Sequence, residues 1–299
     1  MPEQGINMRK IFIILLLILL WSCNRSSSEQ GENIITVTIA PYKYFIKEIA
    51  GNDFAVNIMV PSGANPHLYE PYPDQINRLR KSAAYVSNGF LGFEMAWMER
   101  FEEINKTMKK VSAGERIVPI DSHHEHGNSD SHSETADPHY WVSPKCAFEI
   151  ARSVKDLVCG LNPDSAKKYE KNYEILLKKI GQADRKADSL FSVLQRRHFL
   201  IYHPNLAYLA RDYGLVEIAV EYEGKEPPPS RLKELIDLAA KENIKTIFVQ
   251  KEYDSRNAKA IADETGGEIR VIDPLSENWY NSTMDIIEGI HSSLTGSGK

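Results

Sequence analysis

Apolar positions follow two spacings along the chain, and the change from one spacing to the other predicts strands followed by helices. Short segments are apolar at every second position or continuously, whereas the segments between them repeat every three to four residues. In the first half this predicts strands at 35–41, 54–60, 83–89 and 115–121, and helices at 42–51, 73–82 and 92–105. In the second half it predicts strands at 198–202, 216–220, 244–250 and 268–272, and helices at 205–213, 230–242, 256–265 and 281–294. The fold class is therefore α/β, with two lobes that each hold a mainly parallel four-stranded sheet.

A single long helix is predicted between the two halves, over 162–196. Asn162 is a suitable N-cap and Pro163 a suitable first helical residue. Apolar residues then recur at steps of three and four, at Ala166, Tyr169, Tyr173, Leu176, Ile180, Ala183, Ala187, Leu190 and Leu194. About 32 residues at about 1.5 Å each give roughly 48 Å, which is more than one small domain requires. A coiled coil is the alternative, but the flanking strand-and-helix units favour a rigid helix that joins two lobes.

The N-terminus predicts export from the cytoplasm. Arg9 and Lys10 precede an uncharged apolar run, Ile11 to Trp21, that is too short to span a bilayer. A positive segment followed by such a run is typical of a secretory signal, which we place at residues 1–22.

The residues around the predicted cleavage point suggest a lipid anchor. Leu20-Trp21-Ser22-Cys23 resembles a bacterial lipobox, although Trp21 is atypical, and the resemblance implies that Cys23 becomes the lipid-modified first residue. The alternative is a cleaved signal with an incidental cysteine. The polar residues that follow favour a flexible tether over 23–34. We therefore expect a protein outside the cytoplasm, anchored to a bacterial membrane and facing the periplasm.

Length and charge restrict the function further. The chain has 299 residues and a formal net charge of −5, so nothing in it points to nucleic acid. The length and the apolar content suffice for two domains with two cores. We assign an N-terminal lobe to 35–161 and a C-terminal lobe to 197–299, and we expect a monomer.

Three histidines are the best candidates for a metal site. His67, His139 and His203 each lie on a turn that contains proline, in GANPHLYEPYP, DPHYWVSP and LIYHPNLAYLARDYG. Gaps of 72 and 64 residues separate them, so only tertiary structure could bring them together. Imidazole suits zinc, and three histidines with a carboxylate or a water would complete a four-coordinate site. The alternative is three unrelated loop histidines.

The predicted strands place these residues at related positions. His67 comes after strand 54–60 and His203 directly after strand 198–202, at the carboxyl ends where open α/β sheets bind ligands. His139 precedes a helix that begins near Pro144. Asp273 ends strand 268–272 and could supply a carboxylate. The two lobes would thus present their loops to a shared cleft.

Several motifs in order identify a family resemblance between about residues 35 and 294. They are GANPHLYEPYPDQI, AAYVSNGFLGFE, DPHYWVSP, YHPNLAYLARDYGL, GKEPPPSRLKELI and VIDPL. The chain resembles the zinc/manganese solute-binding proteins of bacterial ABC transporters, the cluster A-I family. The resemblance implies two four-stranded lobes bridged by a long helix, one metal buried between them, and a membrane permease as partner.

The resemblance also implies a set of ligands. By motif, His67, His139 and His203 correspond to the first three ligands of the family. Histidine at the third place is similar to zinc-selective members, whereas many manganese-selective members have glutamate there. This implies Zn²⁺, with Mn²⁺ as the alternative. The fourth ligand varies among members between an aspartate at the Asp273 position, a carboxylate near the first histidine, for which Glu70 is the nearest residue here, and water.

A histidine-rich segment is a second possible metal feature. It contains His123, His124, His126 and His132. Family members that bind zinc often carry such a loop at this place. Histidine-rich tracts bind metal generically, so the segment is either a weak secondary site or an ordinary polar loop.

Two other function classes remain as alternatives. A zinc-dependent hydrolase would use Asp273 or Glu70 as a base, but the chain lacks HExxH, GxSxG and a phosphate-cradling glycine loop. Nothing in the sequence tests a role in cell adhesion. We expect a protein that is not an enzyme and that delivers zinc to a permease. Because ligation requires neutral histidine, the zinc affinity should fall when the pH drops below the ordinary imidazole pKa of about 6.5.

Overall fold

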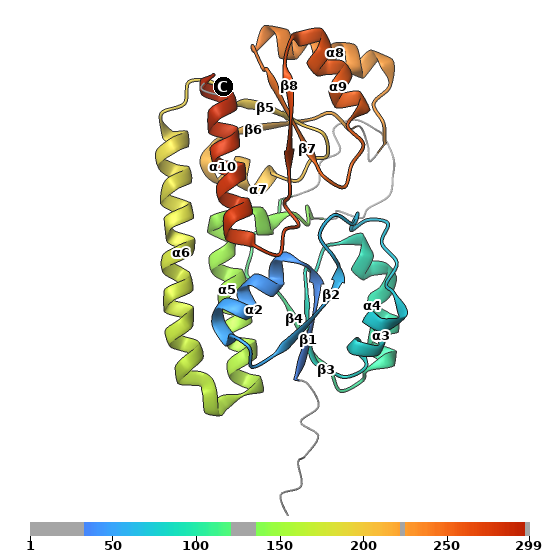
Figure 1. Ribbon diagram of the computed structural model, residues 1–299, viewed down its shortest axis with the longest axis vertical. Coiled ribbons are helices and arrows are strands. Elements are labelled where there is room, and N and C mark those ends of the chain that lie inside the picture. The colour runs from blue at the N-terminus through green and yellow to red at the C-terminus, as the bar shows by residue number, and fades with distance from the viewer. Residues whose placement is uncertain (1–32, 121–135, 222–224, 297–299) are drawn as a thin grey trace, which may run out of the picture. The chain divides into compact units, whose positions relative to one another are not determined.

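Two four-stranded parallel sheets organise the computed structural model, which describes residues 33–120, 136–221 and 225–296 (Figure 1). The first sheet has the order β2-β1-β3-β4, and the second has the order β6-β5-β7-β8. The strands are β1 (Ile34–Ile39), β2 (Ala55–Val60), β3 (Ser82–Ser87), β4 (Lys109–Ser112), β5 (His198–Ile201), β6 (Val216–Ala219), β7 (Thr246–Gln250) and β8 (Glu268–Ile272). All described strand pairs are parallel, so the predicted fold class is confirmed.

Helices connect the parallel strands in both sheets, as the alternating pattern predicted. They are α2 (Pro41–Ala50), α3 (Pro73–Leu79), α4 (Gly92–Ile104), α5 (Pro144–Leu161), α6 (Ala166–Ser192), α7 (Ala207–Tyr213), α8 (Pro229–Lys241), α9 (Arg256–Thr265) and α10 (Trp279–Thr295). Four of them begin with proline, whose missing N–H costs nothing in the first turn of a helix. From Ile34 onward the chain forms one compact unit.

The long helix α6 runs beside helices that come from both halves of the chain (Figure 1). It has 27 residues and packs against α2 and α5 as well as α7 and α10. Its start differs from the prediction, because a short 3₁₀ turn, Pro163–Ser165, precedes it. The side chain of Asn162 does not cap the helix but donates hydrogen bonds to Ser165 Oγ and Tyr169 Oη.

The fourth strand of the first sheet was predicted at the wrong place. Residues 115–120 of the predicted strand form turns and irregular backbone, and Lys109–Ser112 pairs with β3 instead. β4 lies at the edge of its sheet with Lys109 and Lys110 exposed, so it carries no apolar alternation. The apolar residues of the predicted strand serve a loop, in which Ile117 is buried.

The two expected cores exist, but they do not divide at the boundary between the lobes. Residues of β5 alternate between them, as side chains of a strand must. Phe199 and Ile201 belong to a cluster that continues through α5 and α6 into the first sheet. Leu200 and Tyr202 belong to a smaller cluster beneath α8 and α9. The face of the second sheet that carries Phe199 and Ile201 is therefore packed continuously with the first lobe.

Several predicted features of the N-terminus and of the histidine-rich segment lie outside the described residues. They are the signal at 1–22, Cys23, most of the tether at 23–34, and His123, His124, His126 and His132. Among the described residues, no helix has the length and apolar character needed to cross a bilayer.

Candidate metal centre

The three predicted histidines meet in space. His67, His139 and His203 each place one ring nitrogen within 4.8 Å of the others. The distances between ring centroids are 5.9 Å for His67 and His139, 5.2 Å for His67 and His203, and 5.3 Å for His139 and His203. Residues separated by more than sixty positions thus form one cluster, as the parallel topology predicted.

His67 is presented by the loop that follows β2. Its backbone N–H donates to Asn65 Oδ1 at 2.8 Å, and a backbone bond from Leu68 N to Asn65 O closes the turn. The side chain keeps an exposed face while its ring packs against the other two histidines. His67 is therefore the ligand candidate nearest to solvent.

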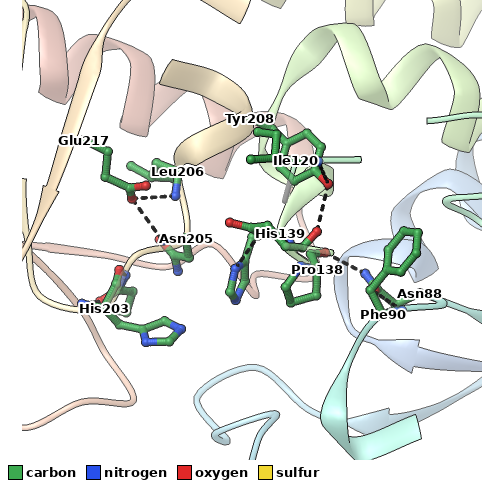
Figure 2. A network of polar contacts seen from close by, with 12 residues as sticks. Asn88, Phe90, Ile120, Pro138, His139, His203, Asn205, Leu206, Tyr208 and Glu217 are labelled. Atoms are coloured by element: carbon green, nitrogen blue, oxygen red, sulfur yellow. Dashed lines mark hydrogen bonds and ion pairs between the residues drawn. The ribbon is translucent and has the colours of Figure 1, made fainter. Parts of the chain in front are cut away.

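His139 is buried and is held by its own turn. Asp137 Oδ1 accepts from the His139 backbone N–H at 2.7 Å and lies 3.0 Å from His139 Nδ1. On the two sides of this turn, Asn88 Nδ2 donates to Pro138 O and Tyr208 Oη donates to Asp137 O (Figure 2). Because the Asp137 carboxylate contacts Nδ1, Nε2 is the nitrogen of His139 that is left to bind a metal ion.

His203 follows β5 and has the same arrangement with another carboxylate. Its Nδ1 lies 2.5 Å from Glu221 Oε2, at the carboxyl end of the neighbouring strand β6. Its ring stacks on Tyr253, with centroids 4.8 Å apart and planes 14° from parallel. Its Nε2 is buried and has no hydrogen-bond partner among the described residues. A buried polar atom without a partner is costly, and this one belongs to a ring that contacts the rings of His67 and His139.

Glu217 fixes the chain directly after His203. Its Oε1 accepts from the backbone N–H groups of Asn205 and Leu206 at 3.0 and 2.8 Å (Figure 2). Burial raises the pKa of Glu217 to about 8, although these two N–H groups oppose the shift. The loop that presents His203 is thus anchored at two points, through Glu217 and through Gln250, whose Nε2 donates to His203 O.

The electrostatics of the cluster favour the neutral form of the His67 and His203 rings. Although one face of His67 is exposed, burial of its ring among the surrounding residues, together with the neighbouring His139 and His203, lowers its pKa to about 3. Burial also lowers the pKa of His203, although Glu221 opposes the shift. Burial raises the pKa of the Asp137 carboxyl, but its interactions with His139, which include two hydrogen bonds, outweigh burial and lower the pKa overall. Neutral rings beside ionised carboxylates are the protonation states that a metal site requires.

The spacing of the nitrogens suits a single small cation. The centre of a triangle with sides of 4.8 Å lies about 2.8 Å from each corner, whereas zinc lies about 2.0–2.1 Å from histidine nitrogen. Small rotations of the rings would close the difference. At zinc sites, carboxylates that contact the second ring nitrogen of a histidine orient that histidine, and Asp137 and Glu221 make contacts of this kind with His139 and His203.

Asp273 lies just after β8, as predicted, but its carboxylate has other partners. Lys251 Nζ lies 2.5 Å from Asp273 Oδ2, and Ser62 Oγ donates to the same oxygen at 3.1 Å. Asp273 does not belong to the group formed by the three histidines, and neither does Glu70, which is exposed. The identity of the fourth ligand therefore stays a prediction.

Four further residues shape the site and were not singled out from the sequence. They are Asp137, Glu217, Glu221 and Tyr253. Asp137 stands inside the motif DPHYWVSP, and Glu221 follows a predicted strand as His203 does. Both positions carried a signal that a search for partners of Nδ1 would have found. Glu217 lies inside a strand, where an acidic residue suggests only a solvent-facing position.

Comparisons with known proteins agree with this geometry. Residues 35–289 match the family described as zinc-uptake complex component A, periplasmic. The zinc-binding lipoprotein AdcA of Streptococcus pneumoniae (strain R6) is 26% identical over 281 residues, which are 90% of this chain and 56% of that protein. The chain thus spans little more than half the length of this curated relative.

Two solved structures share the fold. A crystal structure of ZnuA superposes with a TM-score of 0.82 at 33% identity, covering 88% of this chain and all of that one. A ZnuA deletion mutant with zinc bound superposes with a TM-score of 0.80 at 32% identity, covering 88% of this chain and 98% of the other.

Proposed function

We propose that the chain is the metal-capturing component of a bacterial ABC importer, because it belongs to the family of the periplasmic zinc-uptake component A. Its cargo is Zn²⁺, which it binds outside the cytoplasm and passes to a membrane permease. The metal is cargo and not a resident cofactor. The family is one of uptake components, which supports binding without catalysis, so the hydrolase alternative is set aside.

One observation carries the proposal, namely the convergence of three histidines that each place one ring nitrogen within 4.8 Å of the others. We propose His67, His139 and His203 as the ligands of the metal. Asp137 and Glu221 would orient the His139 and His203 rings from their Nδ1 sides. A buried Nε2 without a partner at His203 supports this assignment, because a lone pair left unsatisfied in a folded protein needs an explanation.

The donor set supports zinc rather than manganese. Imidazole nitrogen suits zinc, whereas manganese prefers carboxylate, carbonyl and water oxygens. The two acidic side chains nearest the rings, Asp137 and Glu221, are engaged with Nδ1 atoms. Two relatives at 26% and 32% identity are named for zinc or hold zinc, whereas the similar structures with Mn bound are 22% identical, so the nearer similarity supports zinc. Manganese remains the alternative that experiment must exclude.

We also propose the location and anchor that the sequence predicts. The signal at 1–22 would direct export, and a lipid on Cys23 would tie the folded unit to a membrane through the tether at 23–34. The name of the similar AdcA protein, a lipoprotein, supports this proposal. The histidines between His123 and His132 would add weaker sites outside the cluster.

The test is the metal content of protein purified without added metal, followed by competition. We expect one zinc per chain, retained against a hundredfold excess of Mn²⁺. Equal occupancy by manganese would replace zinc as the cargo, and the absence of any tightly bound metal would refute the proposal. Zinc-dependent turnover of peptide, ester or phosphate substrates would restore the enzyme alternative.

A further inference from the structure

Three polar residues from three strand ends form a cluster beside the histidines. Ser62 follows β2 in the first sheet, whereas Lys251 and Asp273 follow β7 and β8 in the second. Lys251 Nζ lies 2.6 Å from Ser62 Oγ and 2.5 Å from Asp273 Oδ2. Ser62 Oγ in turn donates to Asp273, at 3.1 Å from Oδ2 and 3.3 Å from Oδ1. The Ser62–Lys251–Asp273 cluster therefore connects loops from both sheets.

The backbone of the first loop is shaped around the lysine. Gly63 has φ +82°, a conformation that residues with a Cβ rarely adopt. A Cβ on Gly63 would also lie 3.2 Å from Lys251 Cε, so the aliphatic part of the lysine packs closely on this glycine. The contact between Lys251 and the loop thus extends from its methylene groups to its ammonium.

The position of the cluster along the chain gives it influence over His67. Ser62 and Gly63 begin the same loop that Asn65 folds into the turn at His67. On the other side, Asp273 precedes Pro274, whose carbonyl accepts from the indole of Trp141, two residues after His139. The cluster therefore joins the segment that presents His67 to a segment that is fixed near His139.

We propose that Lys251 is a positioning residue that ties Ser62 and Asp273 into a latch between the two lobes, so that Asp273 holds the His67 loop instead of ligating the metal. This inference rests on the proposed function, since it concerns how the same three histidines are held. The Lys251 ammonium and the Ser62 hydroxyl both donate to Asp273 Oδ2, and the Ser62 hydroxyl also donates to Oδ1. The metal is then left with three imidazoles and a solvent-facing fourth position.

A consequence of the latch is selectivity. Manganese prefers carboxylate oxygen, so a carboxylate held by an ammonium disfavours manganese more than zinc. Lys251 would thus contribute to zinc preference by withholding Asp273. Replacing Lys251 with methionine keeps a chain of similar length over Gly63 while removing the charge, and replacing it with arginine restores the charge.

The first experiment measures the loop without any metal. Hydrogen exchange of residues 61–68 is compared in chelator-treated wild type, Ser62→Ala, Lys251→Met and Lys251→Arg. We expect exchange about tenfold faster in Ser62→Ala and Lys251→Met, with Lys251→Arg close to wild type, because a network lost at one member loses its coupling. Lys259→Met is the control, since it removes an exposed pair with Asp263 on α9. Unchanged exchange in both Ser62→Ala and Lys251→Met would overturn the latch. Because no metal is present, this result does not depend on whether the three histidines bind zinc.

The second experiment measures the ratio of Mn²⁺ to Zn²⁺ affinity. We expect the ratio to rise about tenfold or more in Lys251→Met, because the freed carboxylate gains access to the metal, and to return in Lys251→Met with Asp273→Asn. In an otherwise native protein, Asp273→Asn should lower zinc affinity by no more than about tenfold, because it loosens the His67 loop without removing a ligand. A loss of more than about a hundredfold in Asp273→Asn, with no change in Lys251→Met, would identify Asp273 as a ligand and overturn the latch.

Discussion

His203 Nδ1 lies 2.5 Å from Glu221 Oε2, and this contact decides which nitrogen of the ring is free. It leaves Nε2 buried without a partner among the described residues, beside the other two histidines. Asp137 contacts Nδ1 of His139 in the same way, from two residues earlier in the same turn. Two carboxylates of the second shell thus orient two of the three candidate ligands.

These carboxylates give the first prediction. Glu221→Gln and Asp137→Asn should each weaken zinc binding by about 10- to 100-fold, because an amide fixes the ring less firmly and makes it a weaker donor. Competition with a chelator of known affinity measures the change. Glu242→Gln is the matched control, since Glu242 contacts His198 away from the cluster. Wild-type affinity in both site variants would remove the carboxylates from the account.

Removal of a ligand should cost more than removal of its orienting carboxylate. We expect His67→Ala, His139→Ala and His203→Ala each to lower zinc affinity by more than about a hundredfold. His198→Ala should bind zinc as the wild type does. Titration with chelator competition compares all four, and circular dichroism verifies that each is folded. A variant that keeps full affinity and stoichiometry would show that its histidine is not a ligand.

Proton release on zinc binding tests the electrostatics of the cluster. Three histidines with a pKa of about 6.5 would release about 2.3 protons at pH 6. The pKa of His67 is lowered to about 3 and that of His203 is also lowered, so fewer protons are left to displace and we expect fewer than two. Zinc affinity should accordingly fall less steeply below pH 6.5 than the sequence alone suggested. Calorimetry in buffers of different ionisation enthalpy counts the protons, and a value above two would contradict the neutral cluster.

Glu217 should make the stability of the metal-free protein depend on pH. Its folded pKa, about 8, is above its ordinary value of 4.5, so the folded state keeps a proton that the unfolded state has lost between these pH values. The contribution of Glu217 to stability is therefore full below pH 4.5 and is lost as the pH rises toward 8. Glu217→Gln resembles the protonated form and should stabilise the protein at pH 8, with a smaller effect at pH 5.

Urea unfolding at the two pH values measures this difference. Glu264→Gln, an exposed substitution on α9, controls for the change from acid to amide. An effect of Glu217→Gln that is the same at pH 5 and pH 8 would show that the carboxyl is not protonated in the folded protein.

The sequence predicted the parts of the structure that have a repeated pattern. Strands buried on both faces, such as β1, and amphipathic helices such as α6 were found because burial determines which positions are apolar. β4 was missed because an edge strand of four residues with two exposed lysines has no such pattern. The start of α6 was misplaced because Asn162 and Pro163 begin a 3₁₀ turn, which has the same first residues as a helix.

The residues of the candidate site were likewise predicted only in part. The histidines were predicted because each lies on a turn that contains proline, and because His67 and His203 also follow strands, where parallel sheets bring side chains together. Their partners depend on which loops contact each other, and this is set by packing between residues distant in sequence. Lys251 shows the limit, because only the folded chain brings its ammonium to Ser62, 189 residues away.

X-ray absorption at the zinc edge of protein loaded with one equivalent of Zn²⁺ tests the three-histidine site most directly. We predict three imidazole ligands, with Zn–N distances of about 2.0–2.1 Å and one further light-atom ligand. The scattering from one imidazole should disappear in His203→Ala. A zinc environment with one imidazole or none, or one that is the same in wild type and in His203→Ala, would contradict the three-histidine site.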